Sequence, residues 1–226
     1  MKVAAIIVAA GSSTRLKGKV HKPYLLLGRK PILLHSLQAF LKIPQISQII
    51  IAAHPRDMER ANRLVKPLIS KYNAQIEIVI GGATRSHSVH NAFKNINKDI
   101  NIVLIHDVAR PFIAKEDIVK VINKTRDKGA AILARPVTDT IKSVAKGLRI
   151  QKTIPRNILW AAQTPQGFRK DIILKAYSLR KSNLADYTDD AGIVESIGAM
   201  VYIIEGSANN IKITTSADLW TKQKIK

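Results

Sequence analysis

The chain of 226 residues contains no cysteine, and aromatic residues make up only 5% of it. The lack of cysteine excludes a disulfide framework, a thiolate nucleophile and any sulfur-ligated metal site, and it fits a reducing compartment, so we expect a cytoplasmic protein. The few aromatic side chains argue against a surface that stacks unpaired bases. The longest early apolar run, residues 3–10, is far too short to span a bilayer, so we expect no membrane segment.

Acidic residues are scarce as well, because 37 Lys and Arg face only 16 Asp and Glu, for a formal net charge of +21. Such a field attracts nucleic acids, acidic membranes and phosphorylated small molecules alike. No helix-turn-helix, RNA-binding or zinc-finger signature accompanies the charge. We therefore interpret most of it as a property of the solvated surface and expect no specific nucleic-acid or membrane partner. A non-enzymatic RNA or DNA binder remains the distant alternative.

Strand-like and helix-like segments alternate along the chain. The continuous apolar, β-branched segment at 3–9 predicts a buried central parallel strand, and further strands are predicted at 47–53, 75–80 and 100–105, the last of them also buried. Apolar residues at helical spacing predict helices at 31–42, 56–72, 85–96 and 115–128. Another βα unit closes at 129–136, followed by helices at 170–181 and 189–196, a strand at 199–205 and a final helix from Ser216. The pattern predicts a doubly wound α/β fold with a mostly parallel sheet, in a single domain spanning 1–226.

The alternation breaks between residues 137 and 154. Two short strands around Lys146 and Gly147 predict a hairpin there, which we expect to protrude from the domain as an arm.

In a doubly wound sheet, ligands bind beyond the carboxyl ends of the strands. The first such loop, residues 10–28, begins with Gly11, and six cationic residues occur by position 30: Arg15, Lys17, Lys19, Lys22, Arg29 and Lys30. Backbone N–H groups at a glycine turn, together with Arg and Lys, suit a phosphate. The glycine spacing matches neither a Walker loop nor a dinucleotide fingerprint. A solvated loop without a ligand is the alternative.

Two further loops carry candidate residues. Gly81 and Gly82 stand between a strand and a helix, where the backbone can approach a flat ligand closely, or where they form an ordinary turn before a capped helix. Asp107 follows a buried strand and suits Mg²⁺, which commonly takes one or two protein carboxylates. Asp107 alone would also be explained as a turn cap or as a partner of Arg110.

Eight features in order make the pattern specific: AAGSSTR, HKPYLLLG, GGATRSHSV, IHDVARPF, Arg156, TPQGF, YTDDA and NIKIT. Together they cover essentially the whole chain, which resembles the 2-C-methyl-D-erythritol 4-phosphate cytidylyltransferase family. The resemblance implies a Rossmann-like nucleotidyltransferase fold and transfer of CMP from CTP to 2-C-methyl-D-erythritol 4-phosphate, in the non-mevalonate isoprenoid pathway. The products would be 4-diphosphocytidyl-2-C-methyl-D-erythritol and pyrophosphate. A ribitol 5-phosphate cytidylyltransferase or another sugar-phosphate nucleotidyltransferase is the close alternative.

The resemblance also implies roles for individual residues. Arg15 and Lys22 would stabilise the transition state, Arg156 and Lys212 would position the methylerythritol phosphate, and Asp107 would hold Mg²⁺. Thr140 and Thr188 would contact the second substrate, while CTP would contact Ala9, Ala10, Gly11, Gly82 and Ser88. Family members are homodimers, and the arm at 137–154 would bring Thr140 and Arg156 to the partner's site. Many relatives have Gly, Pro and Gln where this chain has Ser13, His21 and Pro23, which affects the expected loop path.

The implied reaction needs no general base. A phosphate monoester is largely dianionic at neutral pH, because its second pKa is about 6. This nucleophile would attack the α-phosphorus of CTP and expel pyrophosphate, so the difficulty lies in bringing two anions together. The abundance of cations around the first loop therefore fits the chemistry.

Overall fold

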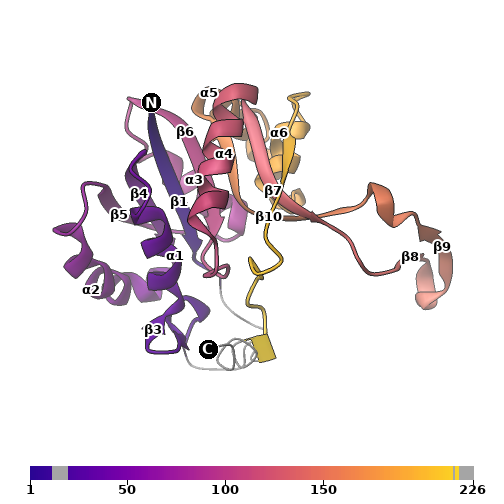
Figure 1. The fold of residues 1–226 in the computed structure, drawn as a ribbon, viewed down its shortest axis with the longest axis horizontal. Helices are drawn as coiled ribbons and strands as arrows, with labels where there is room; N and C mark the ends of the chain where they lie inside the picture. Colours follow the sequence, from indigo (N-terminus) through magenta and orange to yellow (C-terminus); the bar gives the residue numbers. More distant parts are fainter. Residues whose placement is uncertain (12–19, 216, 219–226) are drawn as a thin grey trace.

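The computed structural model describes residues 1–11, 20–215 and 217–218 (Figure 1). Its centre is a seven-stranded sheet with the order β11-β7-β10-β6-β1-β4-β5. The strands of this sheet are β1 (Lys2–Ala9), β4 (Ile46–Ala53), β5 (Gln75–Ile80), β6 (Ile100–Asp107), β7 (Ala130–Pro136), β10 (Trp160–Arg169) and β11 (Tyr202–Glu205). The α-helices are α1 (Ile32–Leu41), α2 (Met58–Ile69), α3 (Arg85–Phe93), α4 (Lys115–Lys128), α5 (Lys170–Leu179) and α6 (Asp190–Glu195).

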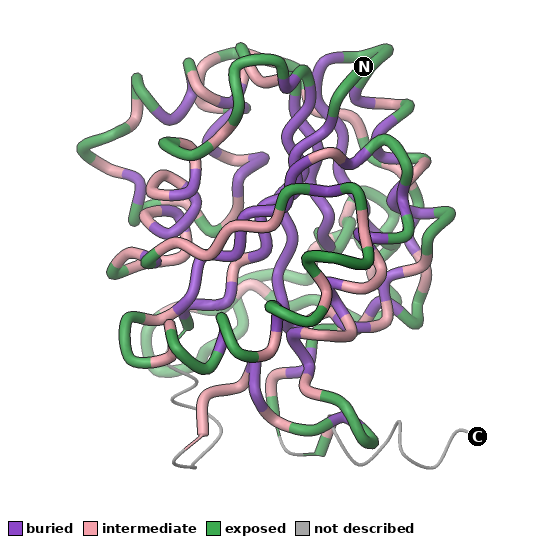
Figure 2. Tube along the Cα trace, turned by 90° about the vertical axis from the view of Figure 1, so that its left-hand side faces the viewer, coloured by how far each residue is buried: buried purple, intermediate pink, exposed green. Residues whose placement is uncertain are grey.

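Strand β1 lies at the centre of the sheet and is buried on both faces. It pairs in parallel with β4 and with β6. The side chains of Val3, Ala5 and Ile7 point into one apolar cluster, with residues of α1, α2 and α4, whereas Ala4 and Ile6 point into another, with residues of α3, α5 and α6. Successive side chains of a strand point to opposite faces, so an unbroken apolar run is what a two-sided core requires. Helices therefore cover both faces of the sheet, which confirms the doubly wound fold, and Figure 2 shows buried chain through the middle of the molecule.

Strand β10 was not predicted from the sequence. It lies between β6 and β7 and is antiparallel to both, so the sheet is mostly rather than wholly parallel. Its pairing with β7 shifts register between Ala162 and Gln166, which spares Pro165 from the hydrogen-bond ladder. The strand was not predicted because it contains the Thr-Pro-Gln-Gly stretch, and proline and glycine in a sequence usually indicate a turn.

The predicted arm is present as the hairpin of β8 (Ile141–Val144) and β9 (Ile150–Ile154). It leaves the sheet between β7 and β10 and extends away from the body of the molecule (Figure 1). Apolar side chains on the arm and its base are exposed to solvent, and Leu148 has 83% of its surface accessible.

The predicted helices and strands agree with the observed ones to within a few residues. The segment predicted as one helix at 56–72 is a 3-10 turn (Pro55–Asp57) followed by α2, which continues through Pro67. Most of the final helix predicted from Ser216 falls outside the described residues. In the part of the chain that is described, no helix has both the length and the apolar character needed to cross a bilayer.

Candidate active site

A cavity of about 620 Å³ opens at the carboxyl ends of β1, β5 and β6. The place is the one expected for a ligand in this fold. Eight of the residues that the sequence singled out line it together: Ala9, Ala10, Gly11, Lys22, Gly82, Ser88, Asp107 and Lys212. Small residues therefore form one part of the wall, and charged side chains form another.

The two glycines after β5 let the loops after β1 and β5 touch. A Cβ atom on Gly81 would lie 2.3 Å from the Cβ of Ala10, and one on Gly82 would lie 2.5 Å from the Cβ of His87. The Gly82 N–H donates to Ser88 Oγ at 3.0 Å, and Ser88 Oγ donates in turn to the Thr84 carbonyl at 2.8 Å. Ser88 thus fixes the turn that ends at the start of α3. The close backbone approach expected at these glycines is present.

Asp107 lies between two cations at the end of β6. Its Oδ1 is 2.8 Å from Arg85 Nε, and its Oδ2 is 2.7 Å from Lys212 Nζ. Burial alone would raise the pKa of Asp107, but the charges and hydrogen bonds of Arg85 and Lys212 outweigh it and hold the pKa well below its usual value. The alternative ion pair with Arg110 is wrong, because that guanidinium donates to the carbonyls of Asn210 and Ala162.

Asp107 fits the protein contribution to a magnesium site. Among the described residues that line the cavity it is the only carboxylate, and its lowered pKa keeps it ionised. Mg²⁺ commonly uses one or two such groups and completes its shell with water and substrate phosphates.

A second carboxylate, that of Asp190, also forms an ion pair with Arg85. Arg85 Nη1 lies 2.8 Å from Oδ2 of Asp190, a fully buried residue whose Oδ1 accepts a hydrogen bond from Tyr177 at 2.6 Å. Burial raises the pKa of Asp190, while the charge of Arg85 opposes that shift. The Thr188-Asp189-Asp190 stretch also caps α6, with Asp189 accepting from the Gly192 N–H at 3.0 Å, whereas the contact of Asp190 with Arg85 was not predicted from the sequence.

Buried His106 lies next to Asp107 in a chain of hydrogen bonds. The Asp107 N–H donates to Thr164 Oγ1 at 3.0 Å, and this hydroxyl lies 3.0 Å from His106 Nδ1. Nε2 of the same ring lies 3.1 Å from the Arg110 carbonyl, which only accepts. The network therefore assigns the proton of a neutral ring to Nε2 and the lone pair to Nδ1. Burial lowers the pKa of His106 to about 4.

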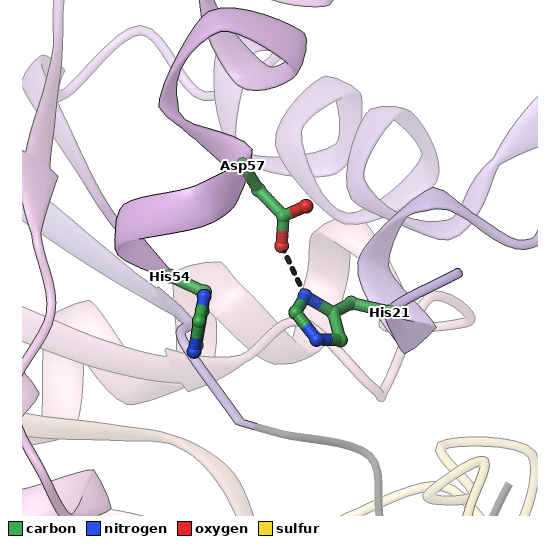
Figure 3. A group of neighbouring side chains, drawn as sticks. All are labelled: His21, His54 and Asp57. Carbon is green, nitrogen blue, oxygen red and sulfur yellow. Dashed lines mark hydrogen bonds and ion pairs between the residues drawn. The ribbon is translucent and has the colours of Figure 1, made fainter. Parts of the chain in front are cut away.

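Lys22 begins a short 3-10 turn (Lys22–Tyr24) that is held against the segment after β4. On one side of Lys22, His21 Nδ1 lies 2.5 Å from Asp57 Oδ2 (Figure 3). On the other, the ring of Tyr24 lies under the Arg60 guanidinium, 4.9 Å from its centroid. The nearby His54 lines the cavity. No sequence pattern pointed to His54 or Asp57, because His21, which contacts both, lies far away in the chain, 36 positions from Asp57.

The remaining predicted residues are Arg15, Thr140, Arg156 and Thr188. Arg15 is outside the described residues. Thr140 and Arg156 flank the two strands of the arm, where Arg156 Nη1 donates to the Thr138 carbonyl at 3.0 Å. Thr188 directly precedes the Asp189 cap of α6. None of these last three lines the cavity of the chain as described.

Comparison with known proteins decides the family. The family model described as 2-C-methyl-D-erythritol 4-phosphate cytidylyltransferase matches residues 3–225. The chain belongs to this cytidylyltransferase family. The family member from Alkaliphilus oremlandii is 41% identical over 226 residues, covering 99% of this chain and 94% of the relative. The one from Caldanaerobacter subterraneus subsp. tengcongensis is 42% identical over 223 residues, covering 97% and 96%.

Solved structures agree with the assignment. The crystal structure of 4-diphosphocytidyl-2C-methyl-D-erythritol synthase from Anaerococcus prevotii has a TM-score of 0.82 and 30% identity, covering 97% of this chain and 95% of that one. The cytidylyltransferase from Francisella tularensis has a TM-score of 0.81 and 33% identity, covering 99% of both chains. As a member of this cytidylyltransferase family, the chain transfers CMP from CTP to 2-C-methyl-D-erythritol 4-phosphate in isoprenoid biosynthesis.

Proposed function

We propose that this cytidylyltransferase works by neutralising phosphate charge in the cavity beyond β1, β5 and β6, without a general base. The observation that carries the proposal is that Lys22, Arg85 and Lys212 line one cavity, in which Arg85 and Lys212 flank a single ionised carboxylate, Asp107. Fixed cations in a partly enclosed site stabilise developing negative charge without having to reorganise during the reaction.

The nucleotide is held by the wall of small residues. Ala9, Ala10 and Gly11 after β1, with Gly82 and Ser88 after β5, leave room for a flat base and ribose close to the main chain. The triphosphate then extends toward Lys22 and Asp107 at the other part of the lining. When Mg²⁺ is bound at Asp107, it supplies further neutralisation of phosphate charge.

The second substrate brings its own nucleophile. An oxygen of the methylerythritol phosphate forms a bond to the α-phosphorus of CTP, and the bond from that phosphorus to the bridging oxygen breaks, so pyrophosphate leaves with the electron pair. No proton has to be removed, because the monoester is largely dianionic. Lys22 and Arg15 stabilise charge on the α-phosphoryl group and the leaving group. Lys212, whose Nζ donates to Asp107 in this structure, binds the phosphate group of the methylerythritol phosphate.

The binding site for the second substrate is completed by a partner subunit in a homodimer. The arm extends away from the body of the molecule, and the arm and its base expose apolar side chains that a single subunit leaves uncovered: Ile141, Val144, Leu148, Ile150, Ile158 and Trp160. An arm of this kind gains stability by packing on another copy of the chain. We assign Thr140 and Arg156 of the arm to the neighbouring site, where they contact the methylerythritol phosphate together with Thr188 of that subunit.

Pyrophosphate release tests the function directly. Purified protein is given CTP, Mg²⁺ and either 2-C-methyl-D-erythritol 4-phosphate or ribitol 5-phosphate, and we expect pyrophosphate only with the first. Release with ribitol 5-phosphate but not with 2-C-methyl-D-erythritol 4-phosphate would instead identify the protein as a ribitol 5-phosphate cytidylyltransferase. Tight, salt-sensitive nucleic-acid binding without any pyrophosphate would favour the non-enzymatic alternative. The cytoplasmic location expected from the composition stays a prediction.

A further inference from the structure

Three metal-ligating side chains lie together beside the nucleotide cavity, and the reaction described above uses none of them (Figure 3). His21 directly precedes the 3-10 turn Lys22–Tyr24, whereas His54 and Asp57 lie in the segment after β4. One ligand atom from each of the three lies within 4.8 Å of the others. All three residues are partly buried, so packing restrains the group while solvent still reaches it.

The cluster is preorganised before any ligand arrives. His21 Nδ1 lies 2.5 Å from Asp57 Oδ2, and the rings of His21 and His54 are 4.7 Å apart between centroids. The two chain segments are also joined by Tyr24, whose hydroxyl donates to the Asp57 carbonyl at 3.5 Å. A ligand set held together by its own protein costs less to assemble around an ion.

We propose that His21, His54 and Asp57 bind one first-row transition-metal ion of the Zn²⁺ type, separate from the magnesium at Asp107. Two imidazoles and one carboxylate form a ligand set that suits Zn²⁺ and its neighbours, whereas Mg²⁺ prefers oxygen ligands only.

Binding requires only small movements of these side chains. Bonds of about 2.0–2.2 Å place the ligand atoms of a tetrahedral ion roughly 3.3 Å apart. The ion therefore takes the place of the proton shared by His21 and Asp57, and the third ligand moves inward. Nδ1 of His54 accepts a hydrogen bond from the Arg56 N–H at 3.2 Å, and coordination exchanges this long bond for a metal bond.

The fourth coordination position is left for water or a phosphate oxygen. The segments outside the described residues contain no His, Cys, Asp or Glu, so they add no such side chain as a ligand. His54 lines the nucleotide cavity, which puts the bound ion at its rim. The ion would tie the residue before Lys22 to the loop after β4, and so restrict the turn that presents this lysine.

Metal titration of the untagged, full-length chain tests the site. Co²⁺ serves as the visible-absorption probe and Zn²⁺ is titrated by calorimetry, both in excess Mg²⁺, which occupies oxygen-only sites. We expect one equivalent to bind per chain, with the intense cobalt bands of a four-coordinate ion. His54→Gln and Asp57→Asn should each weaken binding by at least about tenfold. His35→Gln is the matched control and should bind as the wild type does.

The proposal fails on either of two results. One is a wild-type protein that shows no saturable binding of Co²⁺ or Zn²⁺ in excess Mg²⁺. The other is unchanged affinity in both His54→Gln and Asp57→Asn. Circular dichroism establishes that each variant is folded, and His21→Gln replaces any variant that is not.

Discussion

Lys212 Nζ lies 2.7 Å from Asp107 Oδ2, although 105 positions separate the two residues in the chain. The C-terminal segment is anchored beside this contact, because Ile213 is fully buried and its N–H donates to the Ala109 carbonyl at 2.8 Å. The packing of Ile213 therefore positions Lys212 at the site. A surface lysine placed in this way retains its freedom to leave Asp107 for a phosphate.

Removing the charge of Asp107 should reduce both activity and stability. Asp107→Asn leaves Arg85 and Lys212 close together without their shared anion, so we expect the free energy of unfolding to fall by about 1–3 kcal/mol. Urea unfolding measures this, and Asp99→Asn, which breaks an exposed ion pair with Lys2, should cost clearly less stability than Asp107→Asn. Pyrophosphate release should decline at least about tenfold. Equal stability losses in the two variants would contradict the electrostatic account.

Lys22→Ala should lower kcat at least tenfold, which corresponds to about 1.4 kcal/mol in the barrier. The substitution removes the positive charge that we propose stabilises the reacting phosphates. The variant should fold normally, as judged by circular dichroism. We expect the same direction for Arg15→Ala. Lys30→Ala removes an exposed lysine a short distance along the chain, outside the cavity lining, and should retain turnover within about twofold. Wild-type turnover in Lys22→Ala would refute its role.

Stability should depend on pH through His106. The pKa of this buried ring is lowered to about 4, whereas in the unfolded chain it is about 6.5. Between these values the unfolded state binds more protons, so the contribution is fully present above about pH 6.5 and is lost as the pH falls toward 4. The maximal slope is about 1.4 kcal/mol per pH unit.

Urea unfolding between pH 5 and pH 8 checks this slope. His106→Gln should flatten the dependence between about pH 5 and 6.5. Its difference from the wild type at pH 8 serves as the baseline for lost packing. Parallel curves for the two proteins would show that His106 does not titrate as described.

Gly81 should tolerate no side chain. In Gly81→Ala the new Cβ would meet the Cβ of Ala10 at 2.3 Å, and backbone must shift to relieve the contact. We expect a loss of about 1–3 kcal/mol in the free energy of unfolding and a higher KM for CTP. Gly11→Ala is the comparison, because none of the described residues lies within 4 Å of its added Cβ, and its stability should change by less than about 0.5 kcal/mol. Equal stability of both variants would contradict the packing argument.

The proposed exchange of arms between subunits predicts complementation. Lys22→Ala and Arg156→Ala homodimers should both be nearly inactive. A heterodimer of the two, purified with different tags, contains one site with intact Lys22 and an intact partner arm, so it should show about half of the wild-type activity. If Arg156 served its own subunit, neither site would be complete and no activity would return. A monomeric wild type in sedimentation would also overturn the assignment.

The sequence predicts the repeating part of the fold because local patterns suffice there. β1 is apolar from Val3 to its end and β4 from Ile49 to its end, and α4 has helical spacing, so each is recognised without its neighbours. β10 is different, because its central Thr164-Pro165 pair is accommodated only by a register shift against β7. Whether a proline lies in a strand or in a turn depends here on a partner strand, which a single sequence does not display.

In the candidate site, too, some residues could be predicted from local patterns and others depend on distant partners. Asp107 and Gly82 stand directly after predicted strands, so topology alone places them at one edge of the sheet. Arg85 and Asp190 come together from the starts of two helices that are separate in sequence, and the resulting ion pair has no local signature. Only the family resemblance supplied Lys212.

The wall formed by Ala9, Ala10, Gly11, Gly81 and Gly82 has a consequence for inhibition. A competitive compound seated there would be recognised chiefly by main-chain atoms, which point mutations leave in place. Enlarging Gly81 to evade the compound would also damage the packing between two loops. Resistance by substitution at this wall should therefore carry a fitness cost, since the same surface must still admit CTP.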